Sequence, residues 1–421
     1  MNKYSLGALA AAGLLAGGLA TSANAADLGG NCCADLEERI AELEATTARK
    51  GNRKVSLTVS GWVAQNITWW DNGDESNVYV HDSGTTLGSN VKFTGQASIV
   101  PGWTAGYVLH MELMGSDSLT MDQNRANGPA LYAGVLSGTD GYNSVQTLQS
   151  YWFIKSDHWG KVSVGLQSQA SDNTAILVDG SGSLVPANWV AFDYRAFTSD
   201  GGSILGAASC GGMGGAIGDC NGLTQNAVRY DTPTFAGFSA SASWGADDFW
   251  DVALRYAGEH HGFKIAAAVA YNEVNDGNYN NLGLAGIGTA DLPDMEYFQA
   301  GVYLQHIGTG LWILGNYGDF EADNLADSQE TWYVKAGIRR NWNHLGATVL
   351  YGEYENVSDA YGNGDGEFDM WGLGAVQEID AAAMSLWIKY RDIEADDGSV
   401  NGTDGDNGEF QLFQFGGLIN F

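Results

Sequence analysis

The feature that most constrains this chain is an alternation of apolar and polar residues with a period of two, sustained from residue 54 to the C-terminus. A period of two places the two sets of side chains on opposite faces of a β-sheet. The first apolar set is Val55, Leu57, Val59, Gly61, Val63 and Ile67. After the first 20 residues, no apolar run approaches the ~18 residues that a membrane-spanning helix needs. The pattern therefore favours an all-β chain and excludes a helical membrane protein.

Sixteen such segments divide the chain, and most have the ~9–11 residues with which a tilted strand crosses a bilayer. We expect strands near residues 54–70, 90–100, 103–114, 146–156, 161–168, 225–232, 236–246, 249–258, 262–272, 295–306, 311–319, 329–340, 345–356, 368–378, 381–392 and 409–421. Connections after even-numbered segments are tight, as at Pro101-Gly102, and most after odd-numbered segments are long and acidic. A soluble sandwich or a β-solenoid also shows alternation, but these lengths and this loop asymmetry are typical of an outer-membrane barrel.

Tryptophans gather near the ends of the expected strands, where amphipathic rings favour the membrane interface. They are Trp69, Trp70, Trp103, Trp159, Trp250 and Trp342. A strand can cross lipid only when its edges are closed into a ring, because lipid offers no hydrogen bonds. We therefore predict a 16-stranded antiparallel transmembrane β-barrel over residues 54–421.

The N-terminus carries an export signal over residues 1–25. Lys3 precedes an apolar stretch, and Ala23-Asn24-Ala25 has the small-residue form of a cleavage site. Residues 26–53 form a separate periplasmic segment, in which Leu36, Ile40 and Leu43 follow the spacing of a coiled coil. A helix this short is marginally stable on its own. We therefore expect it to self-associate. The alternative is a single helix that lies on the barrel. The heptads by themselves favour two strands rather than three.

Charge limits the partners of the chain. It holds 50 Asp and Glu against 19 Lys and Arg, a formal charge of −31. Such an anionic surface disfavours nucleic acid as a partner. The same negative potential favours cations at a channel mouth, although most cations of the expected strands fall on the polar face.

Two internal stretches, Gly160–Gln167 and Asn226–Phe238, resemble the general diffusion porins of Gram-negative outer membranes. The region Cys32–Val63 is similar to porins of alphaproteobacteria, in which a short helical segment precedes the barrel. The last strand, Phe413–Phe421, resembles the terminal assembly signal of outer-membrane barrels. The resemblance implies a water-filled barrel in the cell outer membrane, usually a homotrimer, for passive diffusion of small hydrophilic solutes and ions. It also implies contact with lipid and lipopolysaccharide, and an assembly signal ending in Phe421 that the barrel-assembly machinery recognises. A substrate-selective channel for sugars or organic acids is the alternative.

The longest connection, residues 169–225, is by this resemblance the loop that narrows the pore. Acids on the loop facing cations on the wall would set up a transverse field that selects solutes by charge. The expected loop acids are Asp172, Asp179, Asp193 and Asp200, and the expected basic wall is Lys92, Arg229, Arg255, Lys335, Lys389 and Arg391. The alternative for each of these residues is a solvated charge without a role in selection.

Four cysteines remain, in a compartment that permits disulfides. Cys210 and Cys220 enclose a glycine-rich stretch of the long loop, and we predict a disulfide between them. Cys32 and Cys33 are adjacent and poorly placed to bond each other, so a bridge between subunits is one open possibility.

Motifs of catalysis do not occur in the sequence. It has no G-x-S-x-G elbow, P-loop or H-E-x-x-H helix. Acid-rich turns such as 404–407 lack a full calcium-ligand spacing. We therefore expect neither an enzyme nor a bound metal or cofactor.

Overall fold

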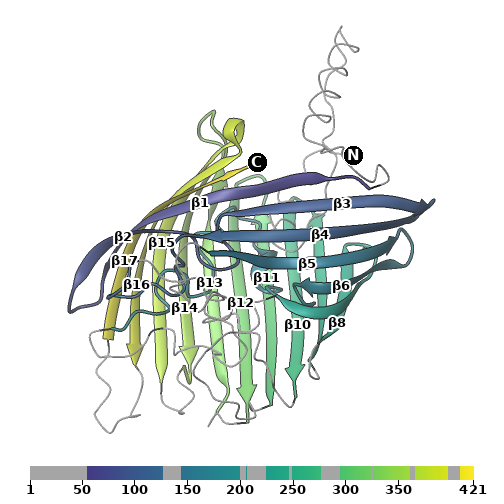
Figure 1. Ribbon diagram of the computed structural model, residues 1–421. Coiled ribbons are helices and arrows are strands. Elements are labelled where there is room, and N and C mark those ends of the chain that lie inside the picture. The colour runs from purple at the N-terminus through teal and green to yellow at the C-terminus, as the bar shows by residue number, and fades with distance from the viewer. Residues whose placement is uncertain are drawn as a thin grey trace.

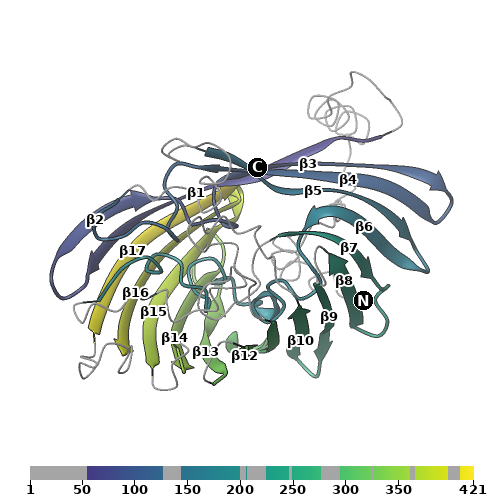
Figure 2. The ribbon, with the colours of Figure 1, turned by 60° about the horizontal axis from the view of Figure 1, so that its bottom comes forward.

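The barrel is seen in a computed structural model that describes residues 55–126, 144–199, 205, 224–245, 249–275, 294–323, 327–360, 366–396 and 408–421. These residues form one antiparallel sheet that closes on itself, with part of the chain inside the ring (Figures 1 and 2). The expected signal segment and the N-terminal heptads lie outside the described residues. Within the described ranges no helix is long and apolar enough to cross a membrane.

Sixteen strands build the ring, and each expected segment overlaps one of them. They are β1 (Thr58–Asp71), β3 (Asn90–Val100), β4 (Trp103–Met114), β5 (Ser144–Ser156), β6 (Gly160–Gln167), β7 (Gln225–Asp231), β8 (Phe238–Gly245), β9 (Trp250–His260), β10 (Phe263–Val274), β11 (Met295–His306), β12 (Leu311–Ala322), β13 (Gln329–Arg340), β14 (Thr348–Ser358), β15 (Glu367–Ile379), β16 (Met384–Asp396) and β17 (Gly408–Asn420). The ring closes where β1 pairs with β17, from Trp62 opposite Asn420 to Asp71 opposite Gln411. The predicted 16-stranded barrel is therefore confirmed.

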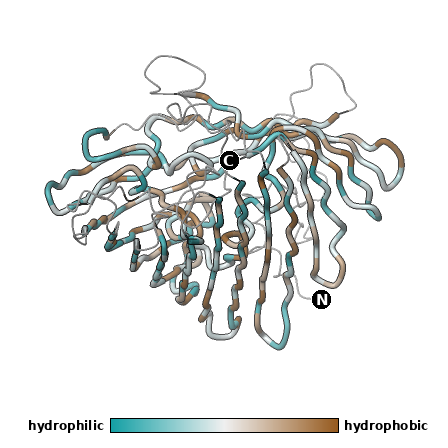
Figure 3. The backbone as a smooth tube through the Cα atoms, turned by 90° about the horizontal axis from the view of Figure 1, so that it is seen from below, coloured by the Kyte–Doolittle hydropathy of each residue, from teal (hydrophilic) through white to brown (hydrophobic). Residues whose placement is uncertain are grey.

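The alternation in the sequence becomes an alternation between the outside and the inside of the barrel. In β1, Val63 and Ile67 are 49% and 48% exposed, whereas Ala64, Asn66 and Thr68 are buried. Hydrophobic and hydrophilic residues alternate along the strands in Figure 3. Apolar side chains thus face the lipid, and the polar set faces the interior, where the rest of the chain covers it.

One tryptophan expected at the membrane interface lies inside the barrel instead. Trp70 is fully buried, and its ring lies 4.9 Å from that of Phe197 in the interior. Consecutive residues of a strand point to opposite faces, so Trp69 and Trp70 cannot both face the lipid. By contrast Trp103, Trp159 and Trp342 are exposed beside the short turns, as an interfacial girdle requires.

The second strand of the barrel is interrupted, which the sequence pattern did not predict. Residues 71–89 were expected to be a loop, yet Ser76–His81 forms the short strand β2, which pairs with the C-terminal part of β1. Strand β3 pairs with the N-terminal part of the same edge of β1. Between β2 and β3, residues 82–89 leave the sheet and are buried inside the barrel; we call them the inward turn. Six residues are too few to span a bilayer, so the alternation in β2 gave too weak a signal.

The gap that the inward turn leaves in the β1 ladder is filled by a side chain. Ser89 Oγ accepts a hydrogen bond from the Ala64 backbone N–H at 3.1 Å and donates one to the Ala64 carbonyl at 3.2 Å. The hydroxyl therefore satisfies the backbone groups that a continuous second strand would have paired.

We predict that Ser89→Ala destabilises the barrel, because two backbone groups of Ala64 at membrane depth lose their partner. An unpaired buried polar group costs about 1–3 kcal/mol. The measurement is the free energy of unfolding in detergent or lipid. Ser98→Ala, at an exposed position near the end of β3, is the control and should leave stability unchanged. Equal stability of the two variants would contradict this role of Ser89.

Candidate functional site in the barrel interior

The interior of the barrel is occupied by residues 168–199, which we call the inner loop. They correspond to the first part of the connection expected to narrow the pore. The inner loop follows the end of β6, includes one turn of 3-10 helix, η1 (Ile176–Val178), and lies within the ring of strands in Figure 2. Hydrogen bonds and ion pairs connect its side chains and backbone to successive strands of the barrel wall, from β7 round to β1.

The first anchor is made by two arginines of the wall. Arg229 on β7 donates to the backbone carbonyls of Ser168 and Gln169, each at 2.9 Å. Arg255 on β9 donates to the carbonyl of Ala170 at 2.5 Å and to Thr174 Oγ1 at 2.8 Å. Both predicted wall cations therefore hold the start of the inner loop.

Acidic and amide side chains complete this first anchor. Asp251 on β9 accepts hydrogen bonds from the backbone N–H and the hydroxyl of Ser171, both at 2.6 Å. Gln299 on β11 accepts from the N–H of Ala175 at 2.8 Å, and Asn316 on β12 donates to the carbonyl of Ala175 at 2.6 Å. These residues could not be singled out from the sequence, because a polar side chain on an interior face carries no signal of what it contacts.

The second anchor is a buried ion pair in the middle of the inner loop. Lys335 Nζ on β13 lies 2.6 Å from Asp179 Oδ2, and neither side chain exposes more than 1% of its surface. The same ammonium donates to the Ala187 carbonyl at 2.6 Å. One predicted wall cation and one predicted loop acid are thus in direct contact.

The third anchor joins β16 to the last part of the inner loop. Lys389 Nζ lies 2.7 Å from Asp193 Oδ2 and donates to the Pro186 carbonyl at 3.1 Å. Arg391 donates to the Asn188 carbonyl at 2.9 Å and pairs with Glu353 of β14 through two hydrogen bonds of 3.0 Å. Glu353 was not predicted, although an acid on the interior face of a strand is the natural partner of a buried guanidinium.

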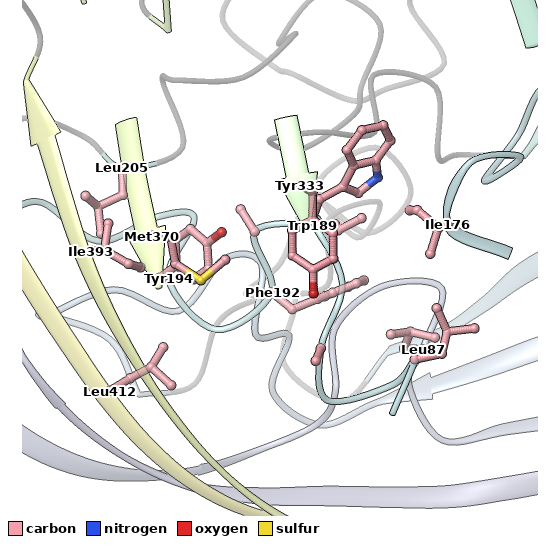
Figure 4. Packing of buried hydrophobic residues seen from close by; sticks show 14 of the residues in the cluster. Leu87, Ile176, Trp189, Phe192, Tyr194, Leu205, Tyr333, Met370, Ile393 and Leu412 are labelled. Atoms are coloured by element: carbon pink, nitrogen blue, oxygen red, sulfur yellow. The ribbon is translucent and has the colours of Figure 1, made fainter. Parts of the chain in front are cut away.

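Apolar packing reinforces these polar anchors. Trp189, Phe192 and Tyr194 of the inner loop are buried in one cluster with Tyr333 of β13 and Met370 of β15 (Figure 4). The end of the loop is fixed near β1, where Asn72 donates to the Thr198 carbonyl at 2.9 Å. The inner loop is therefore packed against the wall from β7 to β17 rather than suspended across the channel.

Burial and charge set the protonation of two loop acids in opposite ways. Burial raises the pKa of Asp172 to about 6, although a hydrogen bond from Ser168 and the charges of Arg229 and Arg255 act against it. Burial alone would also raise the pKa of Asp193, but Lys389 and His81 outweigh it and hold the pKa below its ordinary value. Asp193 therefore stays charged across the physiological range, whereas Asp172 titrates close to it.

A cavity remains on the side of the barrel that the inner loop does not cover. Its volume is about 50 Å³, counted as the space open to the centre of a water molecule. The wall contributes Trp62 of β1, His110 of β4 and Gln149 of β5, and Leu87 of the inward turn closes one side. The loop contributes residues between Ser168 and Phe192, Asp172 among them.

The remaining predicted residues are placed as follows. Lys92 of β3 is buried in the interior next to His110, its partner across the β3–β4 ladder, and stands apart from the inner loop's anchors. Phe421 pairs with β1, its N–H donating to the Gly61 carbonyl at 3.0 Å. Asp200, Cys210, Cys220, Cys32 and Cys33 lie outside the described residues. In the part of the chain that is described, no cluster of three or more His, Cys, Asp or Glu side chains could hold a metal ion.

Solved structures with a similar fold are porins from several bacteria. The anion-selective porin from Comamonas acidovorans has a TM-score of 0.56 at 15% identity, covering 87% of this chain and all of that one. Pseudomonas putida OprB has a TM-score of 0.53 at 10% identity, covering 92% and 97%. Salmonella typhi OmpF, in complex with daunomycin, has a TM-score of 0.52 at 12% identity, covering 88% and 99%. No curated protein matches the sequence.

The sequence itself matches the Gram-negative porin family over residues 8–407, which is nearly the whole chain. The similar structures share the closed barrel, and the family match covers the inner loop and the strands from β1 to β16. The chain therefore belongs to the Gram-negative porin family, and its barrel is an outer-membrane channel for passive diffusion.

Proposed function

We propose that small hydrophilic solutes and ions cross this channel between the inner loop and the wall made by β1, β3, β4 and β5. The observation that carries the proposal is the one-sided anchoring of the inner loop. Most hydrogen bonds and ion pairs between the loop and the wall go to strands β7 to β16, while the cavity lies beside β1, β4 and β5. We propose no enzymatic step. The family match lends no support to a substrate-selective channel for sugars or organic acids.

We propose that the charged residues named from the sequence act in two groups. Lys335, Lys389 and Arg391 are buried against loop carbonyls and acids, which supports a role in holding the constriction in place. Asp172 lines the cavity, and Lys92 lies beside His110, which supports a role in charge selection. A charge beside the narrow passage acts on a solute at short range, where water screens it least.

The assembly of the protein is also part of the proposal. Residues 1–25 are removed as a signal, 26–53 lie in the periplasm, and residues 54–421 insert as the barrel. We propose a homotrimer in contact with outer-membrane lipid and lipopolysaccharide, assembled through the C-terminal Phe421. The support is family membership together with the wide apolar outer face, on which Val63 and Ile67 lie.

We predict that Lys335→Met releases the inner loop. Removing one partner of a buried ion pair leaves Asp179 unpaired at a cost of about 3–5 kcal/mol. Single-channel recordings should then show an altered conductance with much larger current fluctuations than the parent protein.

Two further variants complete this experiment. Arg340→Met removes an exposed charge from the end of the same strand and should leave the recordings unchanged. The double variant Lys335→Met/Asp179→Leu replaces both buried charges by apolar groups. It should reduce the current fluctuations to the level of the parent protein. If Lys335→Met gives the same conductance and noise as the parent, the pair does not hold the loop.

We predict a change of ion selectivity near pH 6. Asp172 has a raised pKa of about 6, so it is negative above that pH and neutral below it. Lowering the pH from 7.5 to 5 should therefore shift the reversal potential in a salt gradient towards anions, with a midpoint close to 6.

Asp172→Asn is the control for this titration. It should show the low-pH selectivity at every pH in this range, and any contribution from histidines should persist in it. Acids with ordinary pKa values titrate about two units lower and would not give this midpoint. A parent protein whose selectivity is constant between pH 7.5 and 5 would rule out Asp172 as a selecting charge.

A further inference from the structure

The cavity beside the inner loop contains buried polar atoms that have no partner. His110 is 3% exposed and lines the cavity, yet within the described residues neither of its ring nitrogens has a hydrogen-bond partner. Gln149 lines the same cavity, and its NH₂ group donates to Ser168 Oγ at 3.2 Å. Its amide oxygen has no hydrogen-bond partner among the described residues. Buried polar groups of this kind are normally satisfied, so these point to a molecule that enters the cavity.

The backbone is irregular at this place, and the irregularity adds side chains to the cavity. The β4–β5 register shifts after His110: Gln149 is opposite His110 and Thr147 is opposite Met111, so Leu148 is an extra residue. Leu148 and Gln149 are consecutive, yet both are buried and both line the cavity. A regular strand would have turned one of them to the lipid, and bulges often re-aim side chains at functional sites.

A positive charge without a compensating acid lies directly beside these groups. Lys92 is opposite His110 in the β3–β4 ladder, so the two side chains share the interior face. Lys92 is 7% exposed, and no acidic side chain of the described chain lies within ion-pair distance of it. In this it differs from Lys335 and Lys389, which each contact an aspartate.

Two acids near the cavity make no ion pair with Lys92. Glu112 lies two residues beyond His110, but its oxygens are taken by the Gly88 N–H at 3.1 Å and the Gln146 amide at 2.9 Å. Asp172 lines the cavity, but Arg229 and Arg255 act on its carboxylate. Among the described residues, the positive charge without an acidic partner that lies nearest this part of the cavity is therefore that of Lys92, next to His110.

The rest of the lining is apolar. Trp62 packs edge-on to His110 with a centroid separation of 6.4 Å, and Leu87, Leu148 and Phe192 complete the surface. Such a lining stabilises a hydrocarbon group in proportion to the area that it removes from water.

We propose that this cavity is a subsite for small organic anions that carry an apolar tail, with the carboxylate at Lys92 and His110 and the tail against Leu148 and Phe192. The subsite rests on the proposed passage through the cavity and adds to it a weak, transient binding step. Gln149 Oε1 is available to an N–H or O–H of the solute. Aliphatic carboxylates should therefore dwell at the constriction longer than chloride or acetate.

The test is the block of ion current through the full-length protein in a planar bilayer. Three probes are added to potassium chloride: pentanoate, acetate with the same charge and a shorter tail, and pentanamide, a neutral analogue of pentanoate. We expect pentanoate to block at a concentration about tenfold lower than acetate, since its three additional methylene groups are partly buried, and pentanamide to block least.

Variants assign the block to its residues. Lys92→Gln should raise the blocking concentration of pentanoate about five- to tenfold. Leu148→Ala should reduce the difference between the blocking concentrations of pentanoate and acetate. Lys155→Gln is the matched control, because Lys155 lies on β5 near its short-turn end, away from the bulge. Pentanoate should block the current through that variant at the same concentration as in the parent protein.

The outcomes separate this inference from the proposed function. Current that flows normally but is blocked equally by pentanoate and acetate, or equally in Lys92→Gln and the parent, overturns the subsite and leaves the channel intact. A reconstituted protein that passes no current overturns the proposed function itself.

Discussion

The structure depends first on the hydrogen bonding of the backbone in lipid. A strand at membrane depth has no water to pair with, so every N–H and C=O must find a partner in the protein. Sixteen antiparallel strands meet this demand by closing β17 onto β1. At the one interior break in the β1 ladder, the hydroxyl of Ser89 takes the place of the missing strand. The break is tolerated because its backbone groups remain paired, and it is this break that allows residues 82–89 to enter the barrel.

The same demand explains why the wall cations contact the inner loop. A loop inside the barrel carries backbone carbonyls that no strand satisfies, and Arg229, Arg255, Lys335, Lys389 and Arg391 each donate to at least one of them. Burying a charge is costly unless it is paired and hydrogen-bonded, and a buried ion pair alone is weak grounds for stability. Here each ammonium or guanidinium also satisfies the loop backbone, so the pairs fix one position of the loop.

The strands could be predicted from the sequence, but the course of the inner loop could not. A period of two fixes the face of a residue, so Lys335 and Lys389 could be assigned to the interior. It does not fix the height of a residue in the barrel or its partner. The Lys335–Asp179 and Lys389–Asp193 contacts join residues 156 and 196 positions apart, and no local pattern encodes such a pairing. Likewise Leu148 and Gln149 share the interior face only because β5 bulges there, which depends on its register with β4.

Charge compensation divides the interior into two regions with different properties. On the side of β7 to β17, positive groups are matched by acids or carbonyls within hydrogen-bond distance, so the field they produce in the channel is short-ranged. On the side of β3 to β5, Lys92 lacks such a partner and the His110 nitrogens are free among the described residues. A matched charge stabilises structure, whereas an unmatched one is available to a passing solute. In an anionic chain of net charge −31, the local surplus of positive charge at the constriction therefore opposes the overall field, and the two together determine which ions pass.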